Sequence, residues 1–271
     1  MGISIAASAH NGGHAVYWAS EGRSASTRMR AEQQGLRDAG TLAHLCATCT
    51  LIVSVCPPDA AEALAQAVTA QHFAGLYVDA NAIAPQRAQR MGERLAAAGI
   101  AFVDGGIIGG PAWKPNSTWL YLSGPQAQEV ADCFAAGPLE ARVIGAAIGK
   151  ASALKMCYAA YSKGTTALLC AVLGAAQQLG VRENLFQQWA QDGAGLAEQA
   201  GPRAQAVTAK AWRFVGEMEE IAATFRAVNM PGGFHDAAAE VYGRLAPFKD
   251  ATTPMPSFED VLVALTTHEN N

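Results

Sequence analysis

The stretch that decides the fold is residues 51–85, LIVSVCPPDAAEALAQAVTAQHFAGLYVDANAIAP. It opens with the β-branched run Leu51–Val55, which has the length and composition of a buried strand. Asp59–Thr69 follows with helical spacing, and its acidic first residue suits the positive end of a helix dipole. Leu76–Val78 is a second apolar run and ends at Asp79. We therefore expect a strand, a helix and a second strand in close succession.

The same alternation continues on both sides of this stretch. Downstream, the sequence predicts a helix over Pro85–Ala98 and a strand over Ile100–Val103 that ends at Asp104. Upstream, it predicts a strand over His14–Ala19 and a polar helix over Thr27–Leu36. Strands that alternate with helices of about 10–15 residues pair in parallel, so we predict a doubly wound α/β sheet. Two further strands are expected, at Trp119–Leu122 and Val143–Ile144.

The second half of the chain has a different pattern, with no convincing strand. Its longest predicted helix is Ser152–Leu179, which is rich in small residues and is stopped by Gly180. Further helices are predicted over Leu185–Ala200, Arg203–Asn229 and His235–Leu245. We therefore place an α/β domain over residues 1–148 and an all-helical domain over residues 149–271.

Composition argues against several classes of protein. The 271 residues carry 19 Lys and Arg against 23 Asp and Glu, for a net charge of −4, which argues against a general nucleic-acid surface. No apolar run reaches the roughly 18–20 residues that cross a bilayer, and the N-terminus does not resemble a signal peptide. We expect a cytoplasmic protein with no membrane or nucleic-acid partner and with free cysteines. No cluster of His, Asp and Glu has convincing ligand spacing, so we expect no metal.

The N-terminus carries part of a nucleotide-binding pattern. Dinucleotide-binding units open with a strand and a Gly-x-Gly-x-x-Gly turn, and a helix N-terminus then holds the pyrophosphate. Gly2 stands where the last glycine belongs, and an apolar helix follows from Ile3. We therefore expect the first strand of the sheet to be missing and the chain to bind a nicotinamide cofactor weakly. A truncated or mis-assigned start and a catalytically silent protein both fit this pattern.

Five motifs taken in order resemble the β-hydroxyacid dehydrogenase superfamily, which includes 6-phosphogluconate dehydrogenase and 3-hydroxyisobutyrate dehydrogenase. They are SVCPP (54–58), VDANAIAP (78–85), FVDGGIIGGP (102–111), TWLYLSG (118–124) and IGKASALKMCYAAYSKG (148–164). The resemblance covers nearly the whole chain. It implies a Rossmann-like dinucleotide-binding domain, a helical substrate domain, and a homodimer that pairs through the helical domain. It also implies hydride transfer between a nicotinamide cofactor and a hydroxyl or carbonyl substrate.

The resemblance assigns cofactor contacts to residues at strand ends. Gly2 matches the third glycine of the turn, and Ser20 stands where NAD enzymes place a carboxylate. Arg23 and Ser24 resemble the pair that binds the 2′-phosphate of NADP in relatives. We therefore predict NADP(H), with NAD as the alternative. The other predicted cofactor contacts are Asn81 and the residues of the turn that passes over the nicotinamide ribose, Cys56, Pro57 and Pro58.

Lys155 is the predicted catalytic residue. In the family, a lysine on the first long helix of the second domain exchanges a proton with the reacting oxygen. The sequence GKASALK (149–155) places Lys155 at that position, and its apolar neighbours Leu154 and Met156 suit a desolvated ammonium group. From the residues alone, a lysine that extends along a helix face to solvent remains the alternative.

The substrate site departs from the family pattern. The family has a Ser-Gly-Gly carboxylate clamp, an Asn one helical turn after the lysine, and a serine in a D-x-S-T motif; this chain has Ile108, Ala159 and Asn81 there. An apolar side chain cannot pair with a substrate carboxylate, so we predict a substrate larger or more apolar than a small hydroxy acid. The predicted substrate contacts are Asn81, Ile108, Gly109, Gly110, Tyr158 and Ala159.

Two other functions stay open. One is an imine reductase, which shares the architecture. Such relatives usually carry Asp or Tyr at the position of Lys155, so this lysine counts against that function. The other is a catalytically silent NADP-binding or sensing protein, which the incomplete glycine turn would suit.

Overall fold

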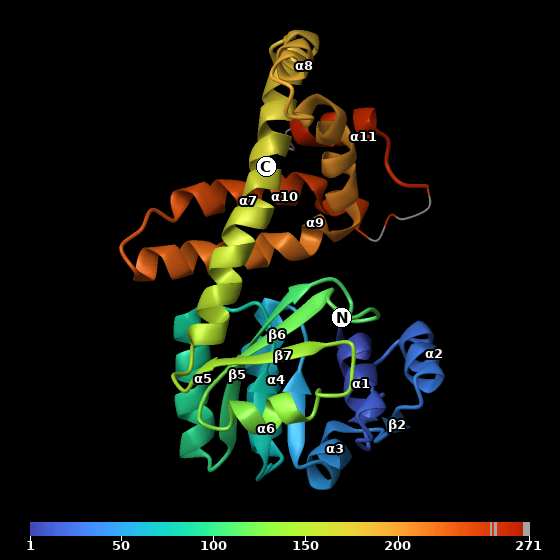
Figure 1. The fold of residues 1–271 in the computed structure, drawn as a ribbon, viewed down its shortest axis with the longest axis vertical. Helices are drawn as coiled ribbons and strands as arrows, with labels where there is room; N and C mark the ends of the chain where they lie inside the picture. The colour runs from blue at the N-terminus through green and yellow to red at the C-terminus, as the bar shows by residue number, and fades with distance from the viewer. Residues whose placement is uncertain (250, 252–253, 268–271) are drawn as a thin grey trace. The chain divides into compact units, whose positions relative to one another are not determined.

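The structure is a computed structural model that describes residues 1–249, 251 and 254–267. It divides into an α/β unit, Met1–Met156, and a helical unit, Cys157–Asn271 (Figure 1). The division falls inside a long helix that starts at Lys150, because the first turns of that helix are bonded to the sheet. The predicted boundary, between residues 148 and 149, lies just before this helix.

The α/β unit has its strands in two sheets. A parallel pair joins β1 (Tyr17–Trp18) to β2 (Arg37–Asp38). The larger sheet has the order β3-β4-β5-β6-β7, with β3 (Leu51–Ser54), β4 (Leu76–Asp79), β5 (Ala101–Gly109), β6 (Thr118–Ser123) and β7 (Glu140–Gly145). Strands β3, β4 and β5 are parallel, and this part of the predicted α/β sheet is confirmed.

Strand β6 differs from the prediction because it runs antiparallel to β5. The reason is local: β5 continues past Asp104 to Gly109, and a short loop turns the chain back along the same edge. A short loop can join antiparallel neighbours, whereas parallel neighbours need a longer crossover. The next strand, β7, is parallel to β6.

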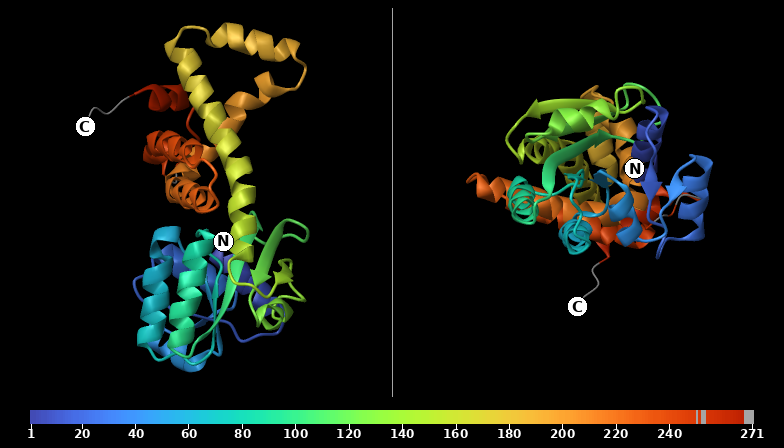
Figure 2. Two further views of the ribbon diagram at one scale, coloured as in Figure 1. Left: turned by 90° about the vertical axis from the view of Figure 1, so that its left-hand side faces the viewer. Right: turned by 90° about the horizontal axis from the view of Figure 1, so that it is seen from below.

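Helices cover both faces of the larger sheet (Figure 2). On one face, α4 (Ala61–Ala70) and α5 (Pro85–Ala97) pack against Ile52, Tyr77 and Phe102, which pair in register across β3, β4 and β5. The residue that follows each of these three in its strand points to the opposite face of the sheet. There α1 (Gly2–Asn11) and α6 (Ala127–Asp132) cover it. The remaining helices of this unit are α2 (Ala25–Gln33), α3 (Leu42–Thr48) and the short 3₁₀ turn η1 (Pro58–Ala60).

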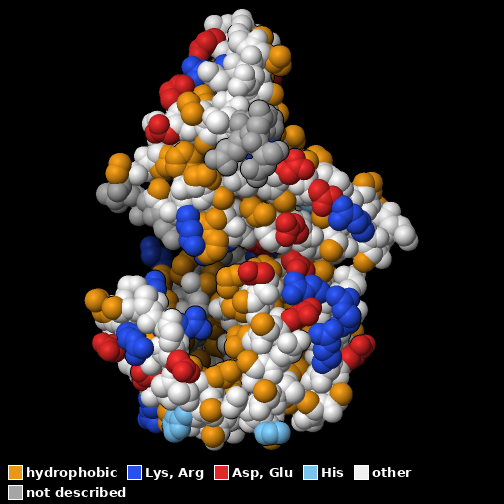
Figure 3. Space-filling model, turned by 180° about the vertical axis from the view of Figure 1, so that it is seen from behind, with side chains coloured by type: hydrophobic (Ala, Val, Ile, Leu, Met, Phe, Trp, Pro, Cys, Tyr) orange, Lys and Arg blue, Asp and Glu red, His pale blue; other side chains and the backbone are white. Residues whose placement is uncertain are grey.

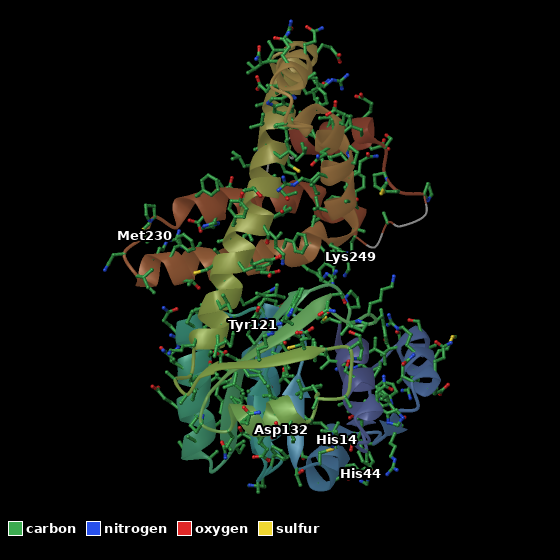
Figure 4. The ribbon with its side chains drawn as sticks, in the orientation of Figure 1. His14, His44, Tyr121, Asp132, Met230 and Lys249 are labelled. Carbon is green, nitrogen blue, oxygen red and sulfur yellow. The ribbon has the colours of Figure 1, made fainter. Side chains whose placement is uncertain are left out.

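The helical unit follows along α7 (Lys150–Gln178), which agrees closely with the predicted Ser152–Leu179. Its other helices are α8 (Arg182–Gln191), α9 (Leu196–Ala227), α10 (Gly233–Leu245) and α11 (Phe258–Thr266), with the 3₁₀ turn η2 (Ala246–Phe248). Helices α9 and α10 pack against each other, and Met230 lies in the turn between them (Figure 4).

The prediction of a helix break near Pro202 is wrong, because α9 passes through this residue. Its neighbours Ala200 and Ala204 are fully buried, and their packing holds the helix together across the missing N–H.

Charges on the face shown in Figure 3 are mixed, with acidic and basic side chains interspersed over the surface. Among the described residues, none of the helices is long and apolar enough to cross a bilayer.

Candidate active site

A row of buried polar residues crosses the strand ends of the larger sheet. Ser54, Asp79 and Asp104 pair in register at the ends of parallel β3 and β4 and within β5, and Asp104 pairs in turn with Ser123 of β6. None of the four is more than 2% exposed. Ligands of α/β sheets bind outside the carboxyl ends of the parallel strands, so this row marks the edge where a site is expected.

Asn81 ties the β3 and β4 ends of the row together. Its Oδ1 accepts a hydrogen bond from the Cys56 backbone N–H at 2.5 Å, and its Nδ2 donates to Ser54 Oγ and Asp79 Oδ2, both at 2.8 Å. The side chain is only 3% exposed. Asn81 thus holds the start of the predicted cofactor turn, Cys56–Pro58, against the end of β4.

The hydrogen bonds of the buried Asp79 carboxyl group offset only part of the cost of its burial. Its pKa is raised to about 6, chiefly by burial and also by the nearby charge of Asp104, while hydrogen bonds from Asn81 and the charge of Arg87 act to lower it. Both of its oxygens accept bonds from Asn81, one from the backbone N–H and one from the side chain.

The predicted cofactor residues after β1 form a tight turn. The Arg23 backbone N–H donates to the Ser20 carbonyl at 3.1 Å, and Ser24 is the N-cap of α2, where its Oγ accepts from the Thr27 N–H. Ser20 is buried and Arg23 is exposed. Burial raises the pKa of the Cys56 thiol, while a hydrogen bond with Ser54 and the charge of Arg23 lower it in part.

The N-terminus of α1 fits an anionic group at this edge. No side chain caps this helix start, and its first turn carries no acidic residue. A Cβ placed on Gly2 would lie 3.8 Å from Val55 Cβ, so the helix start is adjacent to the residue before Cys56. That spacing is ordinary contact, and Gly2 is not needed here for close packing. The helix dipole and the adjacent Cys56 turn together suit the pyrophosphate of a dinucleotide.

At the other end of the row, Asp104 binds the start of α7. Its Oδ2 accepts from the backbone N–H groups of Gly149 and Ser152 and from Ser123 Oγ, each at 3.0 Å. Its Oδ1 accepts from Ser152 Oγ at 2.5 Å. Ser123 Oγ also accepts from the Ala151 N–H at 3.0 Å. A helix start has N–H groups with no partner inside the helix, and here the sheet supplies their acceptors.

This attachment places Lys155 over β5. A Cβ on Gly106 would lie 3.0 Å from Lys155 Cβ and 2.7 Å from the Ala151 carbonyl oxygen, so only glycine allows the helix to pack this closely. Lys155 is half-buried. Gly106 follows Asp104 by two residues, in the same relation that Asn81 has to Asp79. The start of the Lys155 side chain therefore lies against Gly106, two residues beyond Asp104 in β5.

The predicted substrate residues are spread more widely. Ile108 is 6% exposed. Gly109 has a φ of +112° and no room for a side chain beside the Ser117 carbonyl, so the backbone where β5 turns toward β6 is sufficient to explain why this residue is glycine. Gly110 is exposed, with open space around it. Tyr158 and Ala159 belong to the helical unit; Tyr158 is 51% exposed and Ala159 is buried. Their contact with a substrate stays a prediction.

Sequence reasoning did not identify Ser54, Asp104, Ser123 or Ser152 as members of the site. The sequence did contain a signal for Asp79 and Asp104, because each of these acidic residues stands at the end of a predicted strand. Their partners lie far away in the sequence, with 48 positions between Asp104 and Ser152. No group of three or more His, Cys, Asp and Glu within the described residues is arranged to hold a metal ion.

Comparisons with known proteins agree with this architecture. Residues 1–136 match the model of the NAD binding domain of 6-phosphogluconate dehydrogenase, and residues 176–245 match a domain of unknown function, DUF1932. A curated relative from Methanothermus fervidus, an uncharacterized 28.5 kDa protein in the 7S RNA 5′ region, is 29% identical over 168 residues. That match spans 62% of this chain and 64% of the relative, less than two thirds of its length.

Two solved structures resemble the whole chain. The conserved protein MTH1747, of unknown function and structurally similar to 3-hydroxyacid dehydrogenases, is 27% identical with a TM-score of 0.64, over 90% of this chain and 93% of its own. The 3-hydroxyisobutyrate dehydrogenase of Mycobacterium tuberculosis is 18% identical with a TM-score of 0.66, over 98% and 96% of the two chains. Since the first family model covers half of the sequence, this chain belongs to the family of the 6-phosphogluconate dehydrogenase NAD-binding domain, within the β-hydroxyacid dehydrogenase superfamily.

Proposed function

We propose that this protein is an NADP-preferring oxidoreductase that interconverts a hydroxyl and a carbonyl group, with Lys155 as the general acid and base. The observation that carries the proposal is the position of Lys155 against Gly106 of β5, in the same sheet whose β4 end holds the Cys56 turn through Asn81. A half-buried lysine at this edge is placed to meet a substrate bound beside the turn.

Residues at the end of β1 support a preference for NADP(H). The exposed Arg23 guanidinium and the N-terminus of α2, capped by Ser24, both attract a phosphate group. Ser20 offers no carboxylate to a ribose hydroxyl, and it is buried. The turn Cys56–Pro58, held by Asn81, would contact the nicotinamide ribose. When bound, the cofactor supplies the site that accepts or gives the hydride.

In the oxidation direction, the proton and the hydride leave the substrate separately. Lys155 Nζ, as the neutral amine, takes the proton of the substrate hydroxyl while the hydride departs from the carbon. In the reduction direction, the ammonium form returns that proton to the carbonyl oxygen. Lys155 therefore has to orient the oxygen and hold one exchangeable proton.

The substrate that fits this proposal is larger or more apolar than a small hydroxy acid. Ile108 replaces a hydroxyl and is buried, so its side chain cannot pair with a carboxylate. Gly110 remains an exposed backbone position that could receive a polar group.

The proposal is tested by screening aromatic and aliphatic alcohols, aldehydes, hydroxy acids and imines, with NADPH absorbance as the readout. For a substrate found in this way, Lys155→Ala should lower turnover by about 10²–10⁴-fold, the usual span for general acid–base catalysis. NADPH affinity should stay within about twofold, since Lys155 faces the reacting carbon. Lys150→Ala is the matched control, because Lys150 is an exposed lysine at the start of the same helix. Turnover that survives Lys155→Ala would reject the proposal, and activity restricted to imines would favour the imine reductase.

We further propose a homodimer that pairs through α7. A mostly apolar stripe, the α7 stripe, follows the helix at alternating spacings of three and four residues: Tyr158, Tyr161, Thr165, Leu168, Val172 and Ala175. Tyr161 is 78% exposed and Leu168 is 49% exposed. This repeat of about 3.5 residues is that of helices packed side by side, and the same stripe on two copies can form a two-fold interface.

Light scattering at micromolar concentration tests this assembly. The protein should have the mass of a dimer, and Leu168→Asp should shift it toward the monomer. Val263→Asp is the control, because Val263 is 63% exposed and belongs to another helix, α11. A monomeric unmodified protein would rule the dimer out.

A further inference from the structure

Three contacts between the sheet and α7 restrict different movements of the helix. Bonds from the Gly149 and Ser152 N–H groups to Asp104 Oδ2 fix the helix along its axis. The bond from Ser152 Oγ to Asp104 Oδ1 fixes its rotation, because the side chain leaves the helix on one side. Gly106 sets the depth, since the Ala151 carbonyl already occupies the space of a side chain there.

Asp104 takes part in two of these three contacts and lies two residues before Gly106, which makes the third. It is 0% exposed and is part of β5, which pairs with β4 on one side and β6 on the other. Its position is therefore set by the sheet, and α7 takes its position from Asp104. The carboxylate also lies at the positive end of a helix of 29 residues, where a negative charge is favourable.

Lys155 follows Ser152 by three residues, so both side chains lie on the same side of α7. A shift of the helix on β5 therefore moves Lys155 by a similar amount. A misplacement of about 1 Å at a reacting group can lower a rate by about 100-fold.

We infer that Asp104 is a positioning residue of the reaction: by binding Ser152 and the first N–H groups of α7, it holds Lys155 at the distance that proton transfer requires. This inference rests on the proposed role of Lys155. Asp104 itself is enclosed by the sheet and α7, and it acts through the helix.

The test uses Asp104→Asn, which keeps the shape of the side chain but leaves only one acceptor oxygen for bonds that now use two. Hydrogen exchange of the amides in residues 149–155 should become faster. Turnover should fall by about 10–100-fold, while the NADPH affinity and the fraction of chains that bind NADPH stay unchanged. Ser152→Ala should show the same changes to a smaller extent. Ser8→Ala is the control, because Ser8 is also 0% exposed and donates one bond, but within α1.

Unchanged exchange in residues 149–155 would show that Asp104 does not hold the helix and would overturn the inference. A turnover that falls only in proportion to the fraction of chains that bind NADPH would also overturn the inference, because such a decrease reflects a loss of folded protein. Full turnover in Asp104→Asn alongside low turnover in Lys155→Ala would also reject it. If Lys155→Ala keeps full turnover, the proposed function fails first, and faster exchange in Asp104→Asn would then show an anchored helix without a catalytic purpose.

Discussion

Asp79 and Asp104 are buried neighbours in one row of the sheet, yet they are satisfied in different ways. Asp104 accepts four hydrogen bonds, from Ser123 and from the start of α7. Asp79 accepts two, both from Asn81, and burial raises its pKa to about 6. The same residue type at equivalent strand positions thus serves two purposes. Asp104 fixes the helix that carries Lys155, and Asp79 supports the amide that holds the predicted cofactor turn.

The largest difference between the two regions should appear in stability. Asp104→Ala leaves the Gly149 and Ser152 N–H groups and the Ser152 hydroxyl without their acceptor, so we expect the α/β unit to lose about 3–5 kcal/mol. Asn81→Ala leaves one N–H, that of Cys56, without its acceptor and removes one donor each from Ser54 Oγ and Asp79 Oδ2, while Asp79 keeps its bond from the backbone N–H of residue 81. It should cost about 1–3 kcal/mol. Urea unfolding of both variants at neutral pH measures the difference. Equal losses of stability in the two variants would contradict the different roles of Asp79 and Asp104.

The cofactor end should respond selectively to the loss of Arg23. Arg23→Ala should weaken NADPH binding by about 1.5–3 kcal/mol, roughly 10–150-fold, because a charge-assisted phosphate contact is lost. NADH binding should change little. Arg30→Ala is the matched control, since Arg30 is also an exposed arginine but lies within α2, seven residues after Arg23. Fluorescence titration of both cofactors decides the point, and an equal loss for NADPH and NADH would show that Arg23 does not bind the 2′-phosphate.

The smallest expected effect is the pH dependence that comes from Asp79. Its folded pKa of about 6 lies above the ordinary value of 3.8, so the folded state holds a proton between these pH values and the unfolded state does not. Stability from this group is therefore present below about pH 4 and is lost as the pH rises through 6, by about 1–3 kcal/mol. Other carboxyl groups titrate too, so the quantity to measure is the stability of the wild type minus that of Asp79→Asn at each pH. A difference that stays flat from pH 4 to 7 would contradict the raised pKa.

Sequence patterns predicted the buried elements well. The runs at Leu51–Val55 and Leu76–Val78 correspond to β3 and β4 within one residue, because a strand covered on both faces needs apolar residues throughout. Helix α7 was equally clear from its length. The short elements β2, α3 and α6 were missed, because seven or fewer residues carry too little periodicity.

The site was predicted less completely than the fold. Arg23, Cys56, Asn81 and Lys155 came from motifs that each lie in one short segment. The bonds that join these segments, such as Cys56 to Asn81 and Asp104 to Ser152, connect residues separated by 25 and 48 positions. Such pairs depend on strand register and helix packing, which local spacing does not determine.

The central claim is that Lys155 transfers a proton, and turnover of Lys155→Arg tests it most directly. Arginine keeps the positive charge and most of the stem, but its guanidinium does not release a proton near neutral pH. We predict that Lys155→Arg is as impaired as Lys155→Ala, about 10²–10⁴-fold below the wild type, with NADPH affinity unchanged. A Lys155→Arg enzyme with turnover near that of the wild type would show that the charge alone suffices and would contradict the claim.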